Sequence, residues 1–151
     1  MKNNIGKIRA ISISKEKGIP KMNVDSALLI ENWGIDGDIH AGNLHRQISL
    51  LALESIDSMK EKVISDLKPG IFAENLTTEF LKLPILPIGT QIQIGDGCKL
   101  EVTQIGKECH TRCAIYQTAG DCIMPREGIF AKVLKGGTIK VNDEIRILKK
   151  V

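Results

Sequence analysis

The sequence predicts a mainly β protein, in which short strands form a small closed or nearly closed β-barrel with one or two short helices. The hydrophobic fraction is 42% and consists mostly of Ile, Leu and Val, because aromatic residues contribute only 3%. Branched aliphatic side chains favour the pleated surface of a strand. Short runs separated by turn residues fill most of the chain, and one segment has helical spacing. This combination is typical of small barrels.

The first half of the chain contains three expected strands and a glycine-rich loop. The strands cover Ile5 to Ser14, Ala27 to Ile30 and Gln47 to Leu53, and we expect the last of them to be buried. Three glycines fall within the ten residues from Trp33 to Gly42. Such a density indicates a loop with backbone angles that favour glycine.

The next segment changes to helical spacing. Ile56, Met59 and Val63 recur at intervals that place them on one face of a helix, with charged residues on the other side. Pro69-Gly70 ends this helix. Ile71 to Glu79 is expected to be a loop or a short strand.

In the second half, turn dipeptides separate short expected strands, as in a set of hairpins. Asp96-Gly97, Gly136-Gly137 and Asn142-Asp143 are turn signals, and Gly136-Gly137 is most simply a hairpin turn. The expected strands between these turns are Thr90 to Ile94, Cys98 to Gln104, Ile129 to Leu134, Thr138 to Val141 and Glu144 to Leu148.

Length and charge limit the class of protein. We expect residues 1–151 to form a single domain, since this length suits one domain. The net charge of +3 is a mild excess, and one Trp, one Tyr and three Phe leave little material for base stacking, so we expect no nucleic-acid partner. The chain also lacks the phosphate loop, the dinucleotide fingerprint and the sequence motifs of zinc proteases and serine hydrolases.

The chain is expected to be cytoplasmic, without a membrane partner. Met1 to Ala10 is mixed and charged, which predicts no signal peptide, and no apolar run approaches the length of a membrane span. Its four cysteines would then lie in a reducing compartment. We therefore expect reactive thiols, metal ligands or core residues in preference to disulfides.

The densest chemical signal lies between Cys109 and Cys122. Three of the four cysteines and one of the three histidines fall in this segment. Thiolate is the reactive form of cysteine, and the positive charges of Lys107, His110 and Arg112 would favour it. Such a thiolate could accept sulfur as a persulfide, or it could ligate a soft metal.

Two plainer interpretations stand beside this one. Free cysteines are often small core residues, which we favour for Cys98, whereas Cys109 and Cys122 fit either interpretation. For Cys113 we favour a functional role, partly because of the family resemblance given below. A structural zinc held by Cys109, His110, Cys113 and Cys122 is the second alternative, although no second ligand pair follows the short cysteine motif.

Three further groups are candidates for a site. Asp38 and His40 in the glycine-rich loop could orient or protonate a substrate, or they could simply satisfy backbone groups of the turn. The adjacent Glu74 and Asn75 could pin a loop or contact a ligand. Arg126 could bind an anion through its planar guanidinium.

Taken in order, these segments resemble the MOSC family, which is named for the C-terminal domain of molybdenum cofactor sulfurase. The similarity spans roughly residues 5 to 150 and is greatest to the short stand-alone bacterial members. The segments that carry it are Gly37 to Gly42, Arg46 to Leu51, Glu74 to Thr77, Gly89 to Gly95, Val102 to Gln104, Arg112-Cys113 and Gly136 to Asp143. Ala73 and Asn142 depart from the glycines that many members have at these turns.

The resemblance implies a MOSC fold with a reactive cysteine, which carries sulfur from a pyridoxal-phosphate-dependent cysteine desulfurase or ligates molybdenum in a bound cofactor. Cys113 matches this cysteine because it follows Arg112, and Cys109 is a possible accessory. Asp38 and His40 would then form a second wall of the same site.

The resemblance also implies a cofactor and partners. The cofactor is the molybdenum cofactor, an anionic pterin, and pyridoxal phosphate is expected only in a partner desulfurase. The expected partners are a cysteine desulfurase or other proteins of molybdenum cofactor biosynthesis. Residues expected to contact the cofactor are Arg46, Lys107, Arg112, Arg126, Glu74 and Asn75. Two alternatives stay open: a molybdenum-cofactor-dependent reductase component for N-hydroxylated compounds, and a non-catalytic zinc-binding module.

Overall fold

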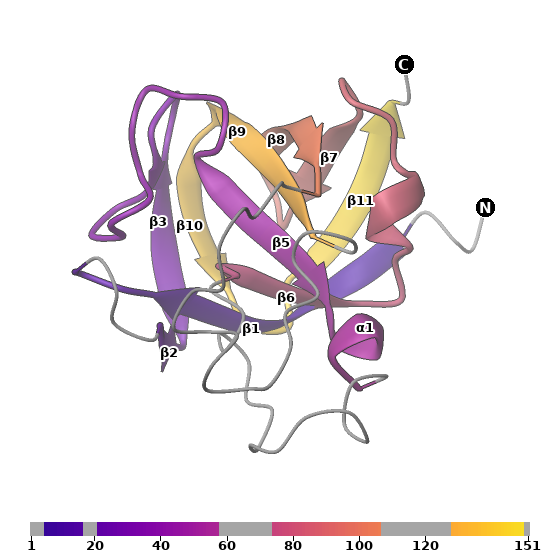
Figure 1. The fold of residues 1–151 in the computed structure, drawn as a ribbon, viewed down its shortest axis with the longest axis horizontal. Coiled ribbons are helices and arrows are strands. Elements are labelled where there is room, and N and C mark those ends of the chain that lie inside the picture. Colours follow the sequence, from indigo (N-terminus) through magenta and orange to yellow (C-terminus); the bar gives the residue numbers. More distant parts are fainter. Residues whose placement is uncertain (1–4, 17–20, 58–73, 107–127, 150–151) are drawn as a thin grey trace.

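The computed structural model describes residues 5–16, 21–57, 74–106 and 128–149, and within these ranges the chain is mainly β, as predicted (Figure 1). Its helical elements there are α1 (Leu53–Asp57) and the 3-10 turn η2 (Leu83–Ile85). The strands are β1 (Ile5–Ile13), β2 (Met22–Val24), β3 (Ser26–Ile30), β4 (Gly34–Ile35), β5 (Ile48–Ala52), β6 (Leu76–Glu79), β7 (Gln91–Ile94), β8 (Cys98–Ile105), β9 (Ile129–Lys135), β10 (Gly137–Lys140) and β11 (Glu144–Lys149).

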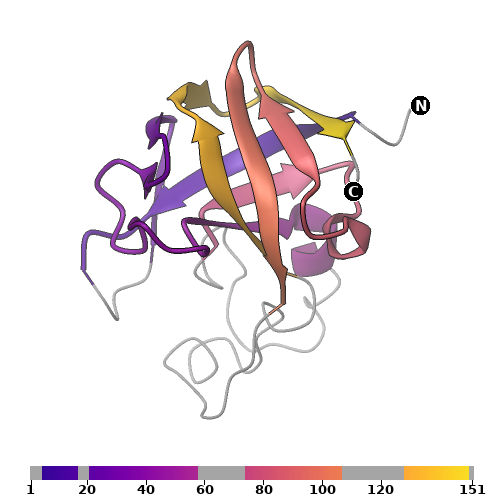
Figure 2. The ribbon, with the colours of Figure 1, turned by 90° about the horizontal axis from the view of Figure 1, so that it is seen from above.

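Seven of these strands close into a barrel, which confirms the predicted fold (Figures 1 and 2). Their order is β11-β7-β8-β9-β5-β6-β1, and the pairing of β1 with β11 completes the ring. β5 and β6 pair in parallel, whereas the other neighbours in the ring pair antiparallel. Closure pairs both edges of every strand in the ring, which removes exposed edges.

Aliphatic side chains from these strands fill the core. All five residues of β5 are buried, as expected from its sequence. Ile8, Ile11, Leu50 and Leu76 are completely inaccessible to solvent. Burying one side chain of this size contributes about 1.5–3 kcal/mol to the stability of the fold. The branched aliphatic residues of the chain therefore stabilise the barrel from its interior.

Residues outside the ring form a second, three-stranded sheet with the order β10-β3-β4. The predicted strand Ala27 to Ile30 belongs to it as part of β3. The two residues of β4 lie within the segment that was expected to be a loop. The rest of that segment is a loop with the expected backbone angles, since Gly37 has a φ of 85°.

The hairpin predicted at Gly136-Gly137 is wrong, because β10 pairs with β3 instead of β9. The glycine pair is a corner at which the chain leaves the barrel for the second sheet. A Cβ on Gly136 would overlap the carbonyl oxygen of Leu29, and Gly137 has a φ of 149°. The corner therefore requires glycine for close approach of two backbones.

Other local predictions are confirmed. Asp96-Gly97 belongs to the turn of a true hairpin, in which Ile94 of β7 faces Cys98 of β8. Cys98 is a buried core residue, as expected. Burial, together with the negative charge of Asp143, raises the pKa of its thiol.

Of the segment predicted to be helical, the structure describes the residues up to Asp57. α1 begins at Leu53 and buries Ile56, whereas Met59, Val63 and Pro69-Gly70 lie outside the described residues. Among the helices that the structure describes, none is long and apolar enough to cross a membrane.

Replacing Gly136 by Ala should destabilise the protein by about 1–3 kcal/mol, the usual cost of forcing extra atoms into a packed site. Urea unfolding measures this loss as a lower midpoint. Gly97→Ala is the matched control, because a Cβ at Gly97 meets no atom within 4 Å. Equal midpoints for the two variants would contradict the proposed corner.

Candidate functional site

A row of paired residues crosses five strands of the barrel and positions the candidate site. Leu50 of β5 faces Leu76 of β6 on one side and Ile129 of β9 on the other. Leu76 in turn faces Ile11 of β1, and Ile129 faces Ile105 of β8. The row therefore connects the last part of β1, the start of β6 and the start of β9 with the end of β8.

Asp38 fastens the glycine-rich loop to the chain that follows β1. Its Oδ1 accepts hydrogen bonds from the backbone N–H of Ser14 at 2.9 Å and from Nζ of Lys21 at 2.8 Å. Its Oδ2 accepts from the backbone N–H of His40 at 3.2 Å. Ile39 N–H also donates to the carbonyl oxygen of Ser14 at 2.7 Å. The loop is thus held by side-chain and backbone contacts together.

Lys21 and Asp38 form a buried ion pair, with side-chain exposures of 1% and 0%. Burial by itself would raise the pKa of Asp38. The hydrogen bond from Lys21, the amide of Ser14, the charge of Lys21 and the side chain of Asn75 outweigh it, so the pKa lies below 3.8. Asp38 is therefore an ionised carboxylate at neutral pH.

His40 connects this buried pair to the surface. Its Nδ1 lies 2.9 Å from Nζ of Lys21, whereas 52% of its side chain is exposed. The distance from Nδ1 to Oδ2 of Asp38 is 3.8 Å, which is too long for a hydrogen bond. Lys21 is therefore the group that connects the carboxylate to the imidazole ring.

Asn75, which directly precedes β6, joins β1 and β5 through its fully buried side chain. Its Oδ1 accepts from the backbone N–H and the hydroxyl of Ser49, at 3.0 and 3.2 Å, and its Nδ2 donates to the carbonyl oxygen of Ser12 at 3.1 Å. Glu74 and Asn75 were expected either to pin a loop or to contact a ligand, and these hydrogen bonds of Asn75 pin the chain before β6. The neighbouring Glu74 is equally buried and accepts a hydrogen bond from Thr77 at 3.1 Å.

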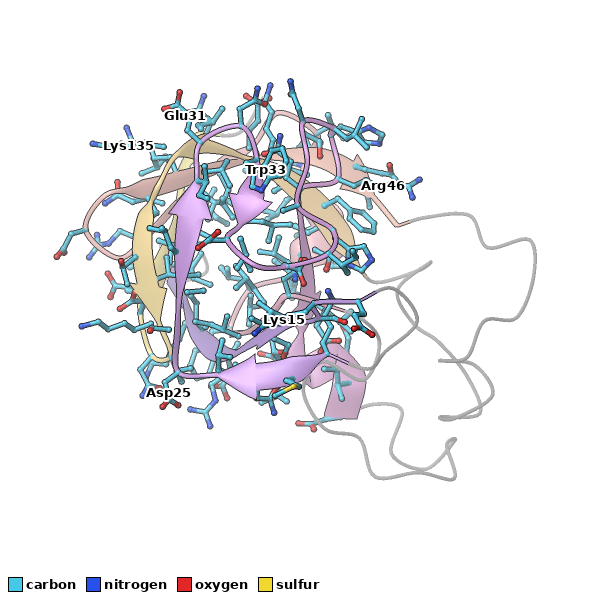
Figure 3. All side chains as sticks on the ribbon, turned by 90° about the vertical axis from the view of Figure 1, so that its left-hand side faces the viewer. Lys15, Asp25, Glu31, Trp33, Arg46 and Lys135 are labelled. Atoms are coloured by element: carbon cyan, nitrogen blue, oxygen red, sulfur yellow. The ribbon has the colours of Figure 1, made fainter. Side chains whose placement is uncertain are left out.

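Arg46 lies at a different point of the barrel surface (Figure 3). Its Nε donates to Oε1 of Gln104 at 2.9 Å, and its guanidinium carbon lies 5.4 Å from the centre of the Phe130 ring. Gln104 and Phe130 face each other across β8 and β9. Two strands therefore hold this exposed guanidinium in a defined orientation.

The same two strands hold both ends of the segment that contains the candidate cysteines. Gly106 N–H donates to the carbonyl oxygen of Gly128 at 2.6 Å, just after Ile105 and just before Ile129. Arg46 is thus beside the place where this segment leaves the barrel and returns to it.

Seven of the predicted residues lie outside the described residues: Lys107, Cys109, His110, Arg112, Cys113, Cys122 and Arg126. The thiolate and zinc hypotheses both depend on residues of this set. In the part of the chain that the structure describes, no group of three or more His, Cys, Asp or Glu side chains could hold a metal ion.

Sequence reasoning missed Lys21. A lysine at the end of a polar turn resembles any solvated lysine, and no local pattern distinguishes it. It also missed the hydrogen-bonding role of Gln47, whose Oε1 accepts from the backbone N–H of Val133 at 2.9 Å. Both roles depend on partners that are distant in the sequence.

The comparison with family models decides the classification. The model of the MOSC domain matches residues 36–146. The chain belongs to the MOSC domain family. This domain is associated with molybdenum-cofactor-related proteins, whereas no curated protein matches the sequence.

Solved structures share the fold. The chain resembles the YuaD protein from Bacillus subtilis with a TM-score of 0.78 and 19% identity, covering 93% of this chain and 94% of that one. It resembles YiiM from Geobacillus stearothermophilus with a TM-score of 0.73 and 18% identity, over 95% and 75% of the two chains. For YiiM from Escherichia coli the values are 0.69, 15%, 96% and 71%. At these identities the likeness concerns the fold alone.

Replacing Asp38 by Asn should destabilise the MOSC domain by about 3–5 kcal/mol, the usual cost of breaking a buried ion pair from one side. The Lys21 ammonium would stay buried without its ionised partner. Urea unfolding at neutral pH measures this loss. Asp36→Asn is the control, since Asp36 is an exposed residue of the same loop, and equal stabilities of the two variants would contradict the assignment.

The Asp38→Asn variant also tests how the stability of the protein depends on pH in acid. Because the pKa of Asp38 is lowered in the folded state from 3.8, the contribution of the pair is complete above this pH and is lost as the pH falls through the lower folded value. The wild-type protein should lose stability in that range, and Asp38→Asn should lack this part of the loss.

Proposed function

We propose that this MOSC domain carries sulfur as a persulfide on Cys113 in molybdenum cofactor metabolism. The observation that supports this most is the buried Lys21–Asp38 pair, which holds the exposed His40. Burying a charged pair costs desolvation energy that an apolar pair would avoid, so such a pair is weak evidence for stability. A buried ionised group that supports an exposed imidazole is a feature of functional sites.

The number of residues between Gly106 and Cys113 is large enough for Cys113 to reach His40. Along the residue row, β1 and β8, which ends just before Gly106, are separated by four strand spacings, which is about 19 Å. Cys113 is seven residues beyond Gly106, and seven extended residues span at most about 24 Å. A thiolate at Cys113 is therefore within chain reach of the wall formed by His40.

The sulfur step needs no added oxidant. The Cys113 thiolate attacks the terminal sulfur of a persulfide on a partner cysteine desulfurase. A bond forms between that sulfur and Cys113, and the desulfurase thiolate leaves. Lys107 and Arg112 would favour the Cys113 thiolate, with Cys109 as an accessory. Pyridoxal phosphate belongs to the partner, and the exchange takes place in the cytoplasm, where thiols stay reduced.

The sulfur acceptor in this proposal is a pterin cofactor, and Arg46 fits its anionic part. Its guanidinium is exposed, oriented by Gln104 and packed on Phe130, and a planar guanidinium can hold a phosphate through two hydrogen bonds. Arg126 would supply a second such group. When bound, the molybdenum centre would supply a soft metal that sulfur can ligate. Glu74 and Asn75 support the site from within the barrel.

Incubation with a cysteine desulfurase and cysteine should add one sulfur atom to the wild-type protein, and mass spectrometry of peptides should locate it on Cys113. Cys113→Ser should lose this addition, because an alcohol does not accept a sulfane sulfur under these conditions. Cys98→Ala is the matched control and should retain it, since Cys98 is a buried core residue.

Two results would count against this function. Sulfur that maps to another cysteine, or a Cys113→Ser variant that loads like the wild type, would remove Cys113 from the proposal. One zinc per chain in the native protein, with unfolding upon chelation, would instead favour the structural zinc alternative.

A further inference from the structure

We propose that His45 is a second ligand-binding residue beside Arg46, and that the two side chains together bind a hydrogen phosphate group in preference to sulfate. Such a group has negatively charged oxygens and one O–H, so its binding site needs both donors and an acceptor. The anion-binding role of Arg46 rests on the proposed function, whereas the role of His45 follows from its contact with Gln104.

The side-chain amide of Gln104 is fixed by contacts at both of its ends. Its Nε2 donates to the carbonyl oxygen of Gly106 at 2.7 Å. Its Oε1 lies 2.9 Å from Nε of Arg46, which is always a donor. The opposite orientation of the amide would bring two donors together at Arg46 and two acceptors together at Gly106. Oε1 therefore faces Arg46, and its second lone pair can accept another hydrogen bond.

This second hydrogen bond determines where His45 carries its proton. Nε2 of His45 lies 2.7 Å from Oε1 of Gln104. Because an amide oxygen only accepts, Nε2 is the donor, and in the neutral form of the ring Nδ1 is the nitrogen with a free lone pair. The backbone of His45 is held as well, since Oγ1 of Thr103 donates to its carbonyl oxygen. The ring is thus anchored through its Nε2 edge and through its backbone.

The remaining polar atoms of His45 and Arg46 lie away from the oxygen that the two residues share. Nδ1 is across the ring from the Nε2 hydrogen bond, and the two Nη atoms are beyond the guanidinium carbon. Both residues are exposed, and within the described ranges neither Nδ1 nor the Nη atoms have a hydrogen-bond partner. Phe130 packs against the face of the guanidinium at 5.4 Å and leaves its edge to a ligand. An acceptor nitrogen and two cationic donors are therefore available at one point of the surface.

This combination distinguishes hydrogen phosphate from sulfate. At mildly alkaline pH both ions are tetrahedral dianions, but only hydrogen phosphate carries an O–H. Arg46 can hold two oxygens of either ion through parallel hydrogen bonds. Nδ1 of His45 can accept the O–H of phosphate, whereas it would face an unprotonated oxygen of sulfate with one lone pair against another. Sulfate therefore lacks one hydrogen bond and brings two acceptors together.

Nitrogen-15 NMR of the histidine rings tests this arrangement in the full-length wild-type protein. We expect Nε2 of His45 to be protonated and the Nδ1 signal of His45 to shift when inorganic phosphate is added. The signals of His45 are assigned by their absence from His45→Gln. A neutral ring with its proton on Nδ1, or an Nδ1 signal that does not respond to phosphate, would overturn the proposal without requiring a variant to keep its function.

NMR titrations with inorganic phosphate and with sulfate, at mildly alkaline pH and constant ionic strength, measure the selectivity. The wild-type protein should prefer phosphate roughly tenfold or more, as expected for a hydrogen bond to a charged group. His45→Gln should lose this preference but still bind sulfate, because the amide of Gln can reach Gln104 and has no atom in place of Nδ1. Arg46→Gln should weaken the binding of both ions.

Lys135→Gln is the matched control for the loss of a positive charge. Lys135 is an exposed residue at the end of β9, whereas Phe130 lies near the start of this strand. Its replacement should leave the preference for phosphate unchanged. Equal affinities of the wild type for phosphate and sulfate, or a preference that survives in His45→Gln, would contradict the role of His45.

A titration with glycerol phosphate distinguishes a phosphate ester from the free ion as the source of the ligand. It is done at mildly acidic pH, where the ester also carries its O–H. Binding of both compounds would support an ester, such as that of a cofactor, and binding of inorganic phosphate alone would support the free ion.

The role of His45 and the sulfur-carrier function fail independently. Sulfur loading on Cys113 in a protein that does not select phosphate would overturn the role of His45 and leave the carrier function intact. Selective phosphate binding in a protein that does not load sulfur would overturn the carrier function and leave the role of His45 intact.

Discussion

The buried ion pair between Lys21 and Asp38 connects the segments that make the candidate site. It links the chain after β1 to the glycine-rich loop, and the Ser14 amide shares the same carboxylate. Removing two charges from water is costly, and only a carboxylate with several donors repays that cost. The pair is therefore a constraint on the neighbouring segments: Ser14, Lys21 and His40 must all stay in place for Asp38 to be satisfied.

Asn75 extends this polar arrangement across the barrel. Its side chain bonds Ser12 in β1 and Ser49 in β5, and it also helps to lower the pKa of Asp38. Because both ends of this amide have partners, the side chain of Asn75 can be buried beside an aliphatic core. Arg46 is independent of this arrangement, since Gln104 and Phe130 hold it near the ends of the cysteine-containing segment. The domain thus presents the imidazole of His40 and the guanidinium of Arg46 at its surface, each held by its own contacts.

Local patterns predicted the barrel and most of its strands because strand formation depends on alternating burial and on turn residues that act over a few positions. β1, β5, β7, β8 and β9 agree with the predicted runs. The corner at Gly136 was misjudged for a physical reason. Two adjacent glycines permit both a hairpin and a close backbone approach, and only the position of Leu29 distinguishes the two.

The sequence by itself predicted a β-barrel, because strand and turn patterns are local properties, and its resemblance to the MOSC family added Asp38 and His40 as site candidates. Only the tertiary structure decided that Asp38 is a buried anion, that Asn75 joins strands and that Lys21 pairs with Asp38. Lys21 is 17 residues from Asp38 in the chain. A charge pair over that separation exists only once the folded barrel brings both groups together and excludes water from them.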